Sequence, residues 1–432
     1  MRSISDSRLL AFEALVEVES HGAYSNLILP KMLSKSSLSL EDKAFASELV
    51  YGSLRMKGRH DALIAQVSDR PLAEIDSKVL IVLRLGVHQL TQMRVPSHAA
   101  IYETVELAKR ATGKSSSSFV NALLRNIDKS SELSSIADKD LLSSLSAEYS
   151  HPEWIVSSYM DSLKSPEEVV ALLVANNTPA RPTLIAWPGR SSIDELIDSG
   201  ASPIEGSTIA AICEGDPGSI PAIRERRAGV QDRGSQIVVE RFLDTFEENL
   251  RWLDLCAGPG GKAAYLSSVI AQRSGELIAN EISKERAALV EQVVAKASVV
   301  NHDGRSLPAA LGTFDRILVD APCTGVGALR RRPEVRWRRT LKDLRELTAL
   351  QSELLDAAAN RLNNDGVIGY VTCSSHQAET KFQIRSFLKR HPEFSRLRVA
   401  DDRSDVDGDL QLWTHKDGCD SMYLALLRKS RE

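Results

Sequence analysis

Over the first 130 residues, apolar side chains recur at the three- and four-residue spacing of an amphipathic helix. The repeat runs through Leu10, Leu15 and Val16 and returns at Val79, Val82, Leu83 and Leu90. Prolines are few, and Pro96 stands where one periodic stretch ends before the next, Ile101 to Lys109, begins. This pattern predicts an all-helical domain over residues 1–135.

The pattern changes twice further along the chain. A polar, serine-rich stretch over residues 130–150 is typical of a linker, and residues 150–235 mix short apolar runs with Gly and Pro, which predicts a small α+β subdomain. From residue 236, apolar runs alternate with helical stretches, which predicts a parallel, doubly wound α/β domain over 236–432. Its expected strands are Trp252–Leu255, Leu277–Ala279, Phe314–Val319 and Gly366–Val371, and its expected helices include Ala263–Ile270 and Leu341–Leu362.

The first candidate site is WLDLCAGPGGKAAYL, residues 252–266, a strand, a glycine-rich turn and a helix. Gly258, Gly260 and Gly261 allow a tight turn and a close approach to a ligand, which the free N–H groups of the next helix can bind. With Glu281 after the next strand, the spacing also fits a dinucleotide fingerprint, although this motif alone is weak. A turn without a ligand, and an exposed loop charge at Glu281, are the plain alternatives.

Two further strands end in cysteine. FDRILVDAPCTGVG, residues 314–327, places Asp320 and Cys323 after a buried strand, and GVIGYVTCSS, residues 366–375, ends in Thr372 and Cys373. Because parallel strands present their carboxyl ends on one edge of a sheet, these groups are expected to gather there with Glu281. A buried structural cysteine is the usual alternative, and a redox pair is also open. A structural zinc site lacks the C-x-x-C or paired histidines that it needs.

The amino-acid composition narrows the class of protein. The chain has 432 residues, 43% hydrophobic and 26% charged residues and a net charge of −4, which is typical of globular domains. No apolar run reaches the roughly 20 residues of a membrane helix, the first residues lack a signal-peptide pattern, and five cysteines without export features predict free thiols in the cytoplasm. One run, RRRPEVRWRR at 330–339, holds six arginines against Glu334 and is compatible with a polyanionic partner.

Taken together, these residues resemble the Sun/RsmB family of RNA (cytosine-C5) methyltransferases that carry a NusB-like domain. The combination of DAPC with TCS is the specific part, and the match extends over most of the chain. The similar stretches are LVYGSLR (49–55), LRLGVHQL (83–90), HAAIYETVELAK (98–109), FVNALLR (119–125), SHPEWIV (150–156), VQDRGSQ (230–236), CAGPGGK (256–262), VDAPCTGVG (319–327), RRRPEVRW (330–337), TCSS (372–375) and HKDGCD (415–420). The resemblance implies a Rossmann-like class I methyltransferase domain behind the helical NusB-like domain and the small subdomain.

The resemblance also implies which residues form the active site. Cys373 is the expected nucleophile that adds to cytosine C6, a role that suits a thiolate, and Cys323 is expected to assist loss of the C5 proton and release of the base. The implied methyl donor is S-adenosyl-L-methionine. Asp320 is expected to serve either the donor or the cytosine ring. The residues expected to bind the donor are Cys256, Ala257, Gly258, Pro259, Gly260, Gly261, Lys262, Glu281, Asp303 and Asp320.

The expected substrate is small-subunit (16S) ribosomal RNA or an assembly intermediate, bound by a monomer without metal or membrane. The arginine run, with Trp337 stacking on a base, is the expected RNA contact, and Arg55, Lys57 and Arg59 are further candidates. Three alternatives stay open: the same chemistry on transfer RNA, a non-catalytic RNA-binding assembly factor, and a nicotinamide-dependent oxidoreductase. The oxidoreductase would leave DAPC and TCS unexplained.

Overall fold

The computed structural model describes residues 6–129, 140–247 and 250–430. Its contacts divide the chain into two compact units. The helical unit comprises Met1–Thr178 and Leu329–Arg338, and the sheet unit comprises Pro179–Ala328 and Arg339–Glu432. The chain therefore leaves the sheet unit for ten residues and then returns to it. The predicted domain boundaries at 135, 150 and 235 stay a prediction.

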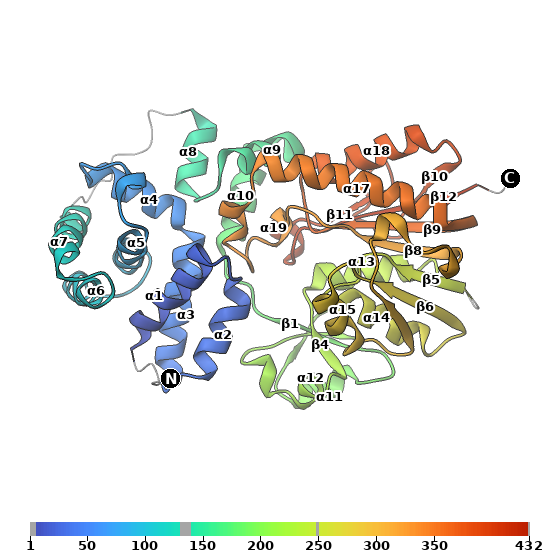
Figure 1. Ribbon diagram of the computed structural model, residues 1–432, viewed down its shortest axis with the longest axis horizontal. Coiled ribbons are helices and arrows are strands. Elements are labelled where there is room, and N and C mark those ends of the chain that lie inside the picture. Colours follow the sequence, from blue (N-terminus) through green and yellow to red (C-terminus); the bar gives the residue numbers. More distant parts are fainter. Residues whose placement is uncertain (1–5, 130–139, 248–249, 431–432) are drawn as a thin grey trace. The chain divides into compact units, whose positions relative to one another are not determined.

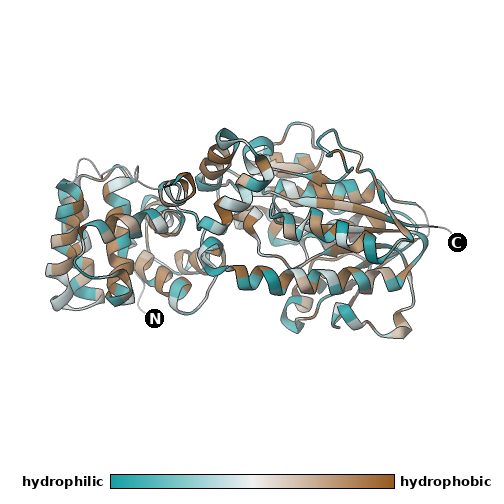
Figure 2. Cartoon of the chain, turned by 90° about the horizontal axis from the view of Figure 1, so that it is seen from above, coloured by the Kyte–Doolittle hydropathy of each residue, from teal (hydrophilic) through white to brown (hydrophobic). Residues whose placement is uncertain are grey.

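The described part of the helical unit is built from amphipathic helices, and Figure 2 shows hydrophobic and hydrophilic residues alternating along them. Polar side chains cap several N-termini: Asp6, Ser39 and Asp76 each accept backbone N–H groups of the first turn. The helices are α1 (Ser7–Ser20), α2 (Ser25–Ser34), α3 (Leu40–Arg55), α4 (Lys57–Val67), α5 (Ser77–Thr91), α6 (Ser97–Ala111), α7 (Lys114–Lys129), α8 (Leu141–Glu148), α9 (Glu153–Leu163), α10 (Pro166–Asn177) and α16 (Val335–Arg338). The predicted helical character of this region and the break at Pro96 are confirmed.

Part of the expected linker is helical. Helix α8 occupies residues 141–148, where Asp140 caps its N-terminus and Leu145 is buried. Serine is tolerated in a helix when apolar neighbours pack, so the polar composition of this stretch was misleading. Residues 130–139 of the expected linker lie outside the described residues.

The arginine run is the main correction to the sequence analysis. Arg336 is completely buried in the helical unit, where its guanidinium donates to Asn177 Oδ1 (2.8 Å) and to the Ser150 and Asn176 carbonyls (3.0 and 3.2 Å). Burial lowers the pKa of Arg336 to about 9. Arg338 donates to the Val18 carbonyl (2.7 Å) in the same unit. Arg336 is therefore unavailable to RNA and Arg338 is largely occupied by backbone acceptors, whereas Arg330, Arg331, Arg332 and Arg339 are partly exposed and their predicted RNA contact stays a prediction.

The other predicted RNA contacts differ in their exposure. Trp337 is partly buried, and the edge of its indole ring lies close to Gly58, where a Cβ would be 2.4 Å from the ring. Arg55 is buried. Lys57 pairs with Glu19 at 3.1 Å. Arg59, on α4, is partly exposed, and its predicted role in RNA binding stays a prediction.

The sheet unit begins with a small antiparallel sheet of strand order β2-β3-β1-β4. Its strands are β1 (Thr183–Ala186), β2 (Ser202–Pro203), β3 (Ala210–Ile212) and β4 (Ala228–Val230), and α11 (Ile193–Asp198) and α12 (Pro221–Arg224) accompany them. Leu184, Leu196, Ala211 and Ile220 belong to one buried cluster between the sheet and these helices. The predicted small α+β region is confirmed.

The larger sheet has the order β10-β12-β9-β8-β5-β6-β7, with the short β11 paired to β12. Strands β7, β6, β5, β8 and β9 are parallel, as predicted, whereas β12 and β10 continue the sheet antiparallel beyond β9. The strands are β5 (Leu250–Asp254), β6 (Gly275–Asn280), β7 (Ala297–Val300), β8 (Phe314–Asp320), β9 (Leu362–Thr372), β10 (Phe394–Leu397), β11 (Leu410–Gln411) and β12 (Tyr423–Lys429).

Helices cover both faces of this sheet (Figure 1), which makes it doubly wound. Alternation along each strand divides the core: Trp252 packs with Phe242 of α13 on one face, whereas Leu253 packs with Leu354 of α17 on the other. The helices of this unit are α13 (Arg233–Leu243), α14 (Gly261–Ile270), α15 (Lys284–Glu291), α17 (Leu341–Arg361), α18 (Lys381–Arg390) and α19 (Thr414–Asp417). In the described part of the chain, no helix has the length and apolar character that crossing a membrane requires.

Candidate active site

The site lies at the carboxyl ends of β5 and β8, where the strand order reverses. From β5 the chain moves outward to β6 and β7, then returns to β8 on the other side of β5. Such a reversal leaves a crevice at the strand ends, where doubly wound proteins bind ligands. Lys262, at the start of α14, and Asp320, the last residue of β8, meet across this point with Nζ and Oδ2 2.9 Å apart.

The Lys262–Asp320 pair is largely shielded from solvent, with side-chain exposures of 12% and 25%. Burial alone would lower the pKa of Lys262, but the Asp320 carboxylate holds it above its ordinary value. The structure therefore keeps a cation at the first turn of α14, where the helix dipole disfavours one. This placement is expected when a positive charge is needed at the site.

The glycine-rich turn is shaped around Glu281, which follows β6. Glu281 accepts the Gly258 N–H through Oε2 and the Ser283 N–H through Oε1, both at 2.9 Å, and pairs with Arg286 at 3.4 Å. A Cβ at Gly258 would lie 2.2 Å from Glu281 Oε2, so a glycine is what allows this approach. The carboxylate is thereby fixed beside the turn that precedes α14.

Asp254, the last residue of β5, is a site residue that the sequence analysis missed. Its side chain is completely buried, and neither oxygen lies in hydrogen-bonding geometry with any donor of the described residues. Burial, followed by the charge of Asp320, raises the pKa of Asp254 to about 8. A buried carboxyl with unmet hydrogen-bonding capacity beside a glycine turn is suited to a polar ligand group. Its position at a strand end is the signal that singled out Asp320 and could have found it.

The two predicted cysteines meet. Cys323 lies three residues beyond β8 and Cys373 directly follows β9, and their sulfurs are 3.2 Å apart. The pKa of Cys323 is raised well above its ordinary value, first by the hydrogen bond with Cys373 and then by burial. Cys323 therefore holds its proton while the two sulfurs are in contact, and the hydrogen bond between them can run in either direction.

Backbone contacts hold the two cysteine segments together. The Gly327 N–H donates to the Cys373 carbonyl (3.0 Å), and the Ser421 N–H donates to the Gly327 carbonyl (2.9 Å). A Cβ at Gly327 would lie 2.0 Å from the Ser421 carbonyl oxygen, so only glycine fits. Asp232 in turn accepts the Asp420 N–H at 2.9 Å. Three stretches that carried the family resemblance, VQDRGSQ, VDAPCTGVG and HKDGCD, are thus joined to TCSS.

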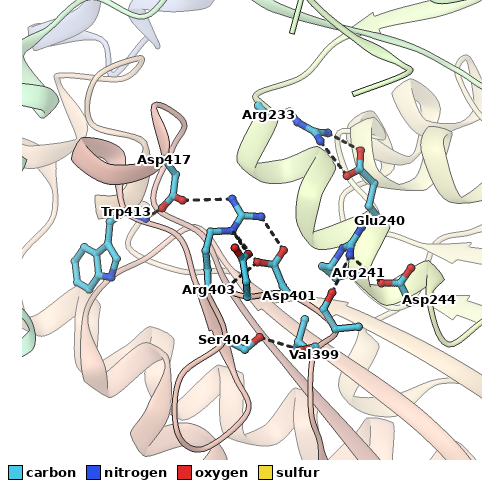
Figure 3. Close-up of polar contacts among 12 residues, drawn as sticks. Arg233, Glu240, Arg241, Asp244, Val399, Asp401, Arg403, Ser404, Trp413 and Asp417 are labelled. Carbon is cyan, nitrogen blue, oxygen red and sulfur yellow. Dashed lines mark hydrogen bonds and ion pairs between the residues drawn. The ribbon is translucent and has the colours of Figure 1, made fainter. Parts of the chain in front are cut away.

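The chain before HKDGCD is held by ion pairs, which Figure 3 shows beside those of α13. Arg403 pairs with Asp401 (2.7 Å) and Asp417 (3.3 Å), and Asp417 accepts the Trp413 N–H (2.6 Å). These contacts order the segment that leads into Asp420 and Ser421, and they explain why this polar stretch has a fixed shape.

The remaining predicted residues have separate environments. Asp303 follows β7, is partly exposed and pairs with Arg305 at 2.7 Å; hydrogen bonds from Arg305 lower its pKa. Cys256 has a pKa raised far above its ordinary value by burial, so it stays a thiol and packs against the core. All five cysteines of the chain are free. Glu379, which sequence reasoning also missed, accepts four hydrogen bonds behind the sulfur pair.

Comparison with known proteins places this geometry in context. Residues 241–428 match the family model described as 16S rRNA methyltransferase RsmB/F, and residues 5–129 match the NusB family. The Mycobacterium tuberculosis protein named "Putative methyltransferase Rv1407" is 39% identical over 99% of this chain and 97% of its own. The ribosomal RNA small subunit methyltransferase B of Escherichia coli is 31% identical over 90% of this chain and 91% of its own.

Solved structures agree on the fold. The crystal structure of PH0851 matches with a TM-score of 0.84 at 21% sequence identity, and the match covers 99% of this chain and 100% of the PH0851 chain. NSun6 from Pyrococcus horikoshii covers 65% of this chain and 99% of its own with a TM-score of 0.57 at 17% identity. The predicted fold class, a Rossmann-like domain behind a helical NusB domain and a small subdomain, is confirmed.

Proposed function

The chain belongs to the RsmB/F family of RNA cytosine-C5 methyltransferases, and we propose that its substrate is small-subunit (16S) ribosomal RNA. Membership excludes the nicotinamide-dependent oxidoreductase that the glycine turn alone left open. The substrate proposal is supported by similarity that runs through the NusB region as well as the catalytic domain, to enzymes named for small-subunit ribosomal RNA. The observation that carries the chemistry is the Cys323–Cys373 contact at the edge of the sheet.

The family uses S-adenosyl-L-methionine, which supplies an electrophilic methyl group when bound. The site fits this donor: a tight turn opens onto the N-terminus of α14, Glu281 lies beside it, and Asp254 has unmet hydrogen-bonding capacity. We assign the ribose to Glu281 and the remaining polar groups of the donor to the turn from Cys256 to Lys262 and to Asp320. Asp303 is assigned to the adenine side.

Cytosine C5 is a weak nucleophile because its electrons are shared with the aromatic ring. In the proposed reaction, the Cys373 thiolate adds to C6, and the electron pair of the C5–C6 double bond becomes available at C5 to take up the methyl group. Loss of the C5 proton then returns an electron pair to the C5–C6 bond, and the bond between C6 and the Cys373 sulfur breaks. The products are 5-methylcytosine, S-adenosyl-L-homocysteine, which is the thioether left when the donor loses its methyl group, and a regenerated Cys373 thiolate.

Cys323 is proposed to take the C5 proton, and its pKa explains the order of events. While Cys373 is a thiolate, it is the main cause of the raised pKa of Cys323, which therefore holds its proton. Once the Cys373 sulfur is bound to C6, its negative charge and its hydrogen bond are gone. The pKa of Cys323 falls, its proton is released to water, and the resulting thiolate can accept the proton from C5.

The test is transfer of labelled methyl from S-adenosyl-L-methionine to unmethylated 16S ribosomal RNA, beside transfer RNA, followed by nucleoside analysis. We expect 5-methylcytosine in the ribosomal RNA only. Label in transfer RNA alone would refute the substrate, and transfer to neither, with donor binding intact, would move the substrate to an assembly intermediate. We also propose that the enzyme works in the cytoplasm, where its five free thiols stay reduced.

A further inference from the structure

We propose that Glu379 is the positioning residue that holds Cys323 within reach of the reaction, so that losing it blocks release of the base more than attack on it. This inference rests on the cysteine roles proposed above. Glu379 lies in the 3₁₀ turn Gln377–Glu379 after β9, and no part of its residue is exposed to solvent. Its hydrogen bonds go to the residues that follow the two cysteines, so it positions their segments, and its charge also helps to raise the pKa of Cys323.

The Glu379 carboxylate joins the two cysteine segments. Oε1 accepts the Thr324 N–H (2.7 Å) and Oε2 accepts the Thr324 hydroxyl (2.5 Å), so the residue after Cys323 is held by both oxygens. Oε2 also accepts the Ser374 hydroxyl at 2.6 Å, from the residue after Cys373. One carboxylate thus bridges the neighbours of both cysteines.

A second support reaches the same loop from α17. The buried Gln351 amide donates to Glu379 Oε1 (3.1 Å) and to the Pro322 carbonyl (2.9 Å). Pro322 and Thr324 flank Cys323, so the loop is fastened on both sides of the cysteine by groups that meet at Glu379. All four hydrogen bonds run from a donor to an acceptor-only carboxylate, as expected for a buried acid that is fully satisfied.

The two cysteines depend on Glu379 to different degrees. Cys373 directly follows a strand paired on both sides, with Thr372 opposite Tyr423 of β12 and Val371 opposite Asp320 of β8. Cys323 lies in the loop beyond the end of β8, and the backbone bonds from this loop to the β9 segment are made by Ala321 and Gly327. Removing Glu379 should therefore displace Cys323 while Cys373 keeps its place. Because a shift of about 1 Å can cost about 100-fold in rate, the proton step should suffer first.

The experiment compares Glu379→Ala and Glu379→Gln in the full chain, with the RNA that wild type methylates. Three quantities are measured: affinity for S-adenosyl-L-methionine, the rate of methyl transfer to product, and the fraction of protein joined to RNA after denaturation. For Glu379→Ala we expect about 100-fold slower turnover, donor affinity within about threefold of wild type, and an accumulated adduct. Glu379→Gln keeps an oxygen that can accept the Thr324 N–H. The hydroxyls of Thr324 and Ser374 can rotate to accept hydrogen bonds from its amide, so this variant should recover most of the turnover.

A matched control separates positioning from loss of stability. Glu334 is an equally buried glutamate in the helical unit that accepts the Ser25 N–H (3.0 Å) and hydroxyl (2.9 Å). Glu334→Ala should lower thermal stability without raising the adduct fraction. If Glu379→Ala does not fold, Thr324→Val, which deletes one of the four bonds, must show a smaller rise in adduct.

Loss of adduct and product together, or a Gln variant as inactive as the Ala variant, would overturn the proposal, as would turnover like that of wild type. A wild-type enzyme that methylates transfer RNA instead would refute the 16S assignment but leave this test in place.

Discussion

The strongest pH effect is expected from Asp254, whose buried carboxyl has a pKa raised from 3.8 to about 8. The perturbation is Asp254→Asn, which removes the titration and keeps the size of the side chain. Between pH 4 and 8 the folded protein holds a proton on Asp254 that the unfolded chain has lost. Since the folded state binds more protons there, its stability falls as pH rises, and the loss stops above the folded-state pKa.

The size of this pH effect on stability follows from the shift in the pKa of Asp254. One pKa unit corresponds to about 1.4 kcal/mol, so wild type should lose up to about 1.4 kcal/mol per pH unit in this window relative to the Asn variant. Between pH 5.0 and 7.5, wild type should lose about 3 kcal/mol of stability relative to the Asn variant. Other groups titrate in both proteins and cancel in the comparison. A pH-independent offset from burying the new amide does not affect the slope.

The assay should report on the sheet unit, because the two units can unfold separately. Peptide-resolved hydrogen exchange of β5 and β6 at pH 5.0, 6.0, 7.0 and 7.5 gives an opening free energy for this sheet in both proteins. We expect the opening free energy of the Asp254→Asn variant to increase relative to that of wild type as pH rises. Parallel profiles across this range would refute the reasoning and show that Asp254 is ionised and solvated at neutral pH.

Four further outcomes are expected. Cys373→Ala should abolish methylation with donor affinity nearly unchanged, and an equal loss of donor affinity would contradict its role as nucleophile. Cys323→Ala should accumulate a denaturant-resistant RNA adduct, and electrophoresis should show that the double variant with Cys373→Ala loses it. Gly327→Ala should reduce methyl transfer at least about 100-fold, because its Cβ meets the Ser421 backbone at 2.0 Å; rates near wild type would show that the segment adjusts. Arg336→Ala should destabilise the helical unit by about 3 kcal/mol in urea unfolding, with an unchanged salt dependence of RNA binding; a shallower slope would restore its role as a phosphate contact.

The catalytic edge was predictable because the signals are local. Buried strands appear as apolar runs, and parallel strands deliver the residues that follow them to one edge. Glu281, Asp320, Cys323 and Cys373 were expected at that edge, and the two cysteine sulfurs do lie 3.2 Å apart. The antiparallel β12 was not predicted. Its sequence, YLALLRK, has a buried apolar character that fits either direction, and only pairing with β9 decides between them.

The prediction that Arg336 contacts RNA was wrong for a physical reason. Six arginines in ten residues are typical of a solvated surface, because burying a guanidinium is costly unless its donors are satisfied. At Arg336 the acceptors are supplied by Ser150, Asn176 and Asn177, more than 150 residues earlier in the chain. Glu379 was missed for the same reason, since its donors Thr324 and Gln351 come from other elements. Composition cannot reveal partners that tertiary structure provides.

The contact between the two sulfurs also constrains how the base enters. At 3.2 Å the Cys323 and Cys373 sulfurs are hydrogen-bonded to each other, so a cytosine that reaches Cys373 must separate them. Cys373 directly follows β9, between β8 and β12, and cannot retreat without breaking the sheet. Cys323 is on the loop, so it is the group that moves. Entry of the base therefore displaces the loop that carries Cys323, and the contacts of Glu379 with Thr324 limit how far that loop can travel.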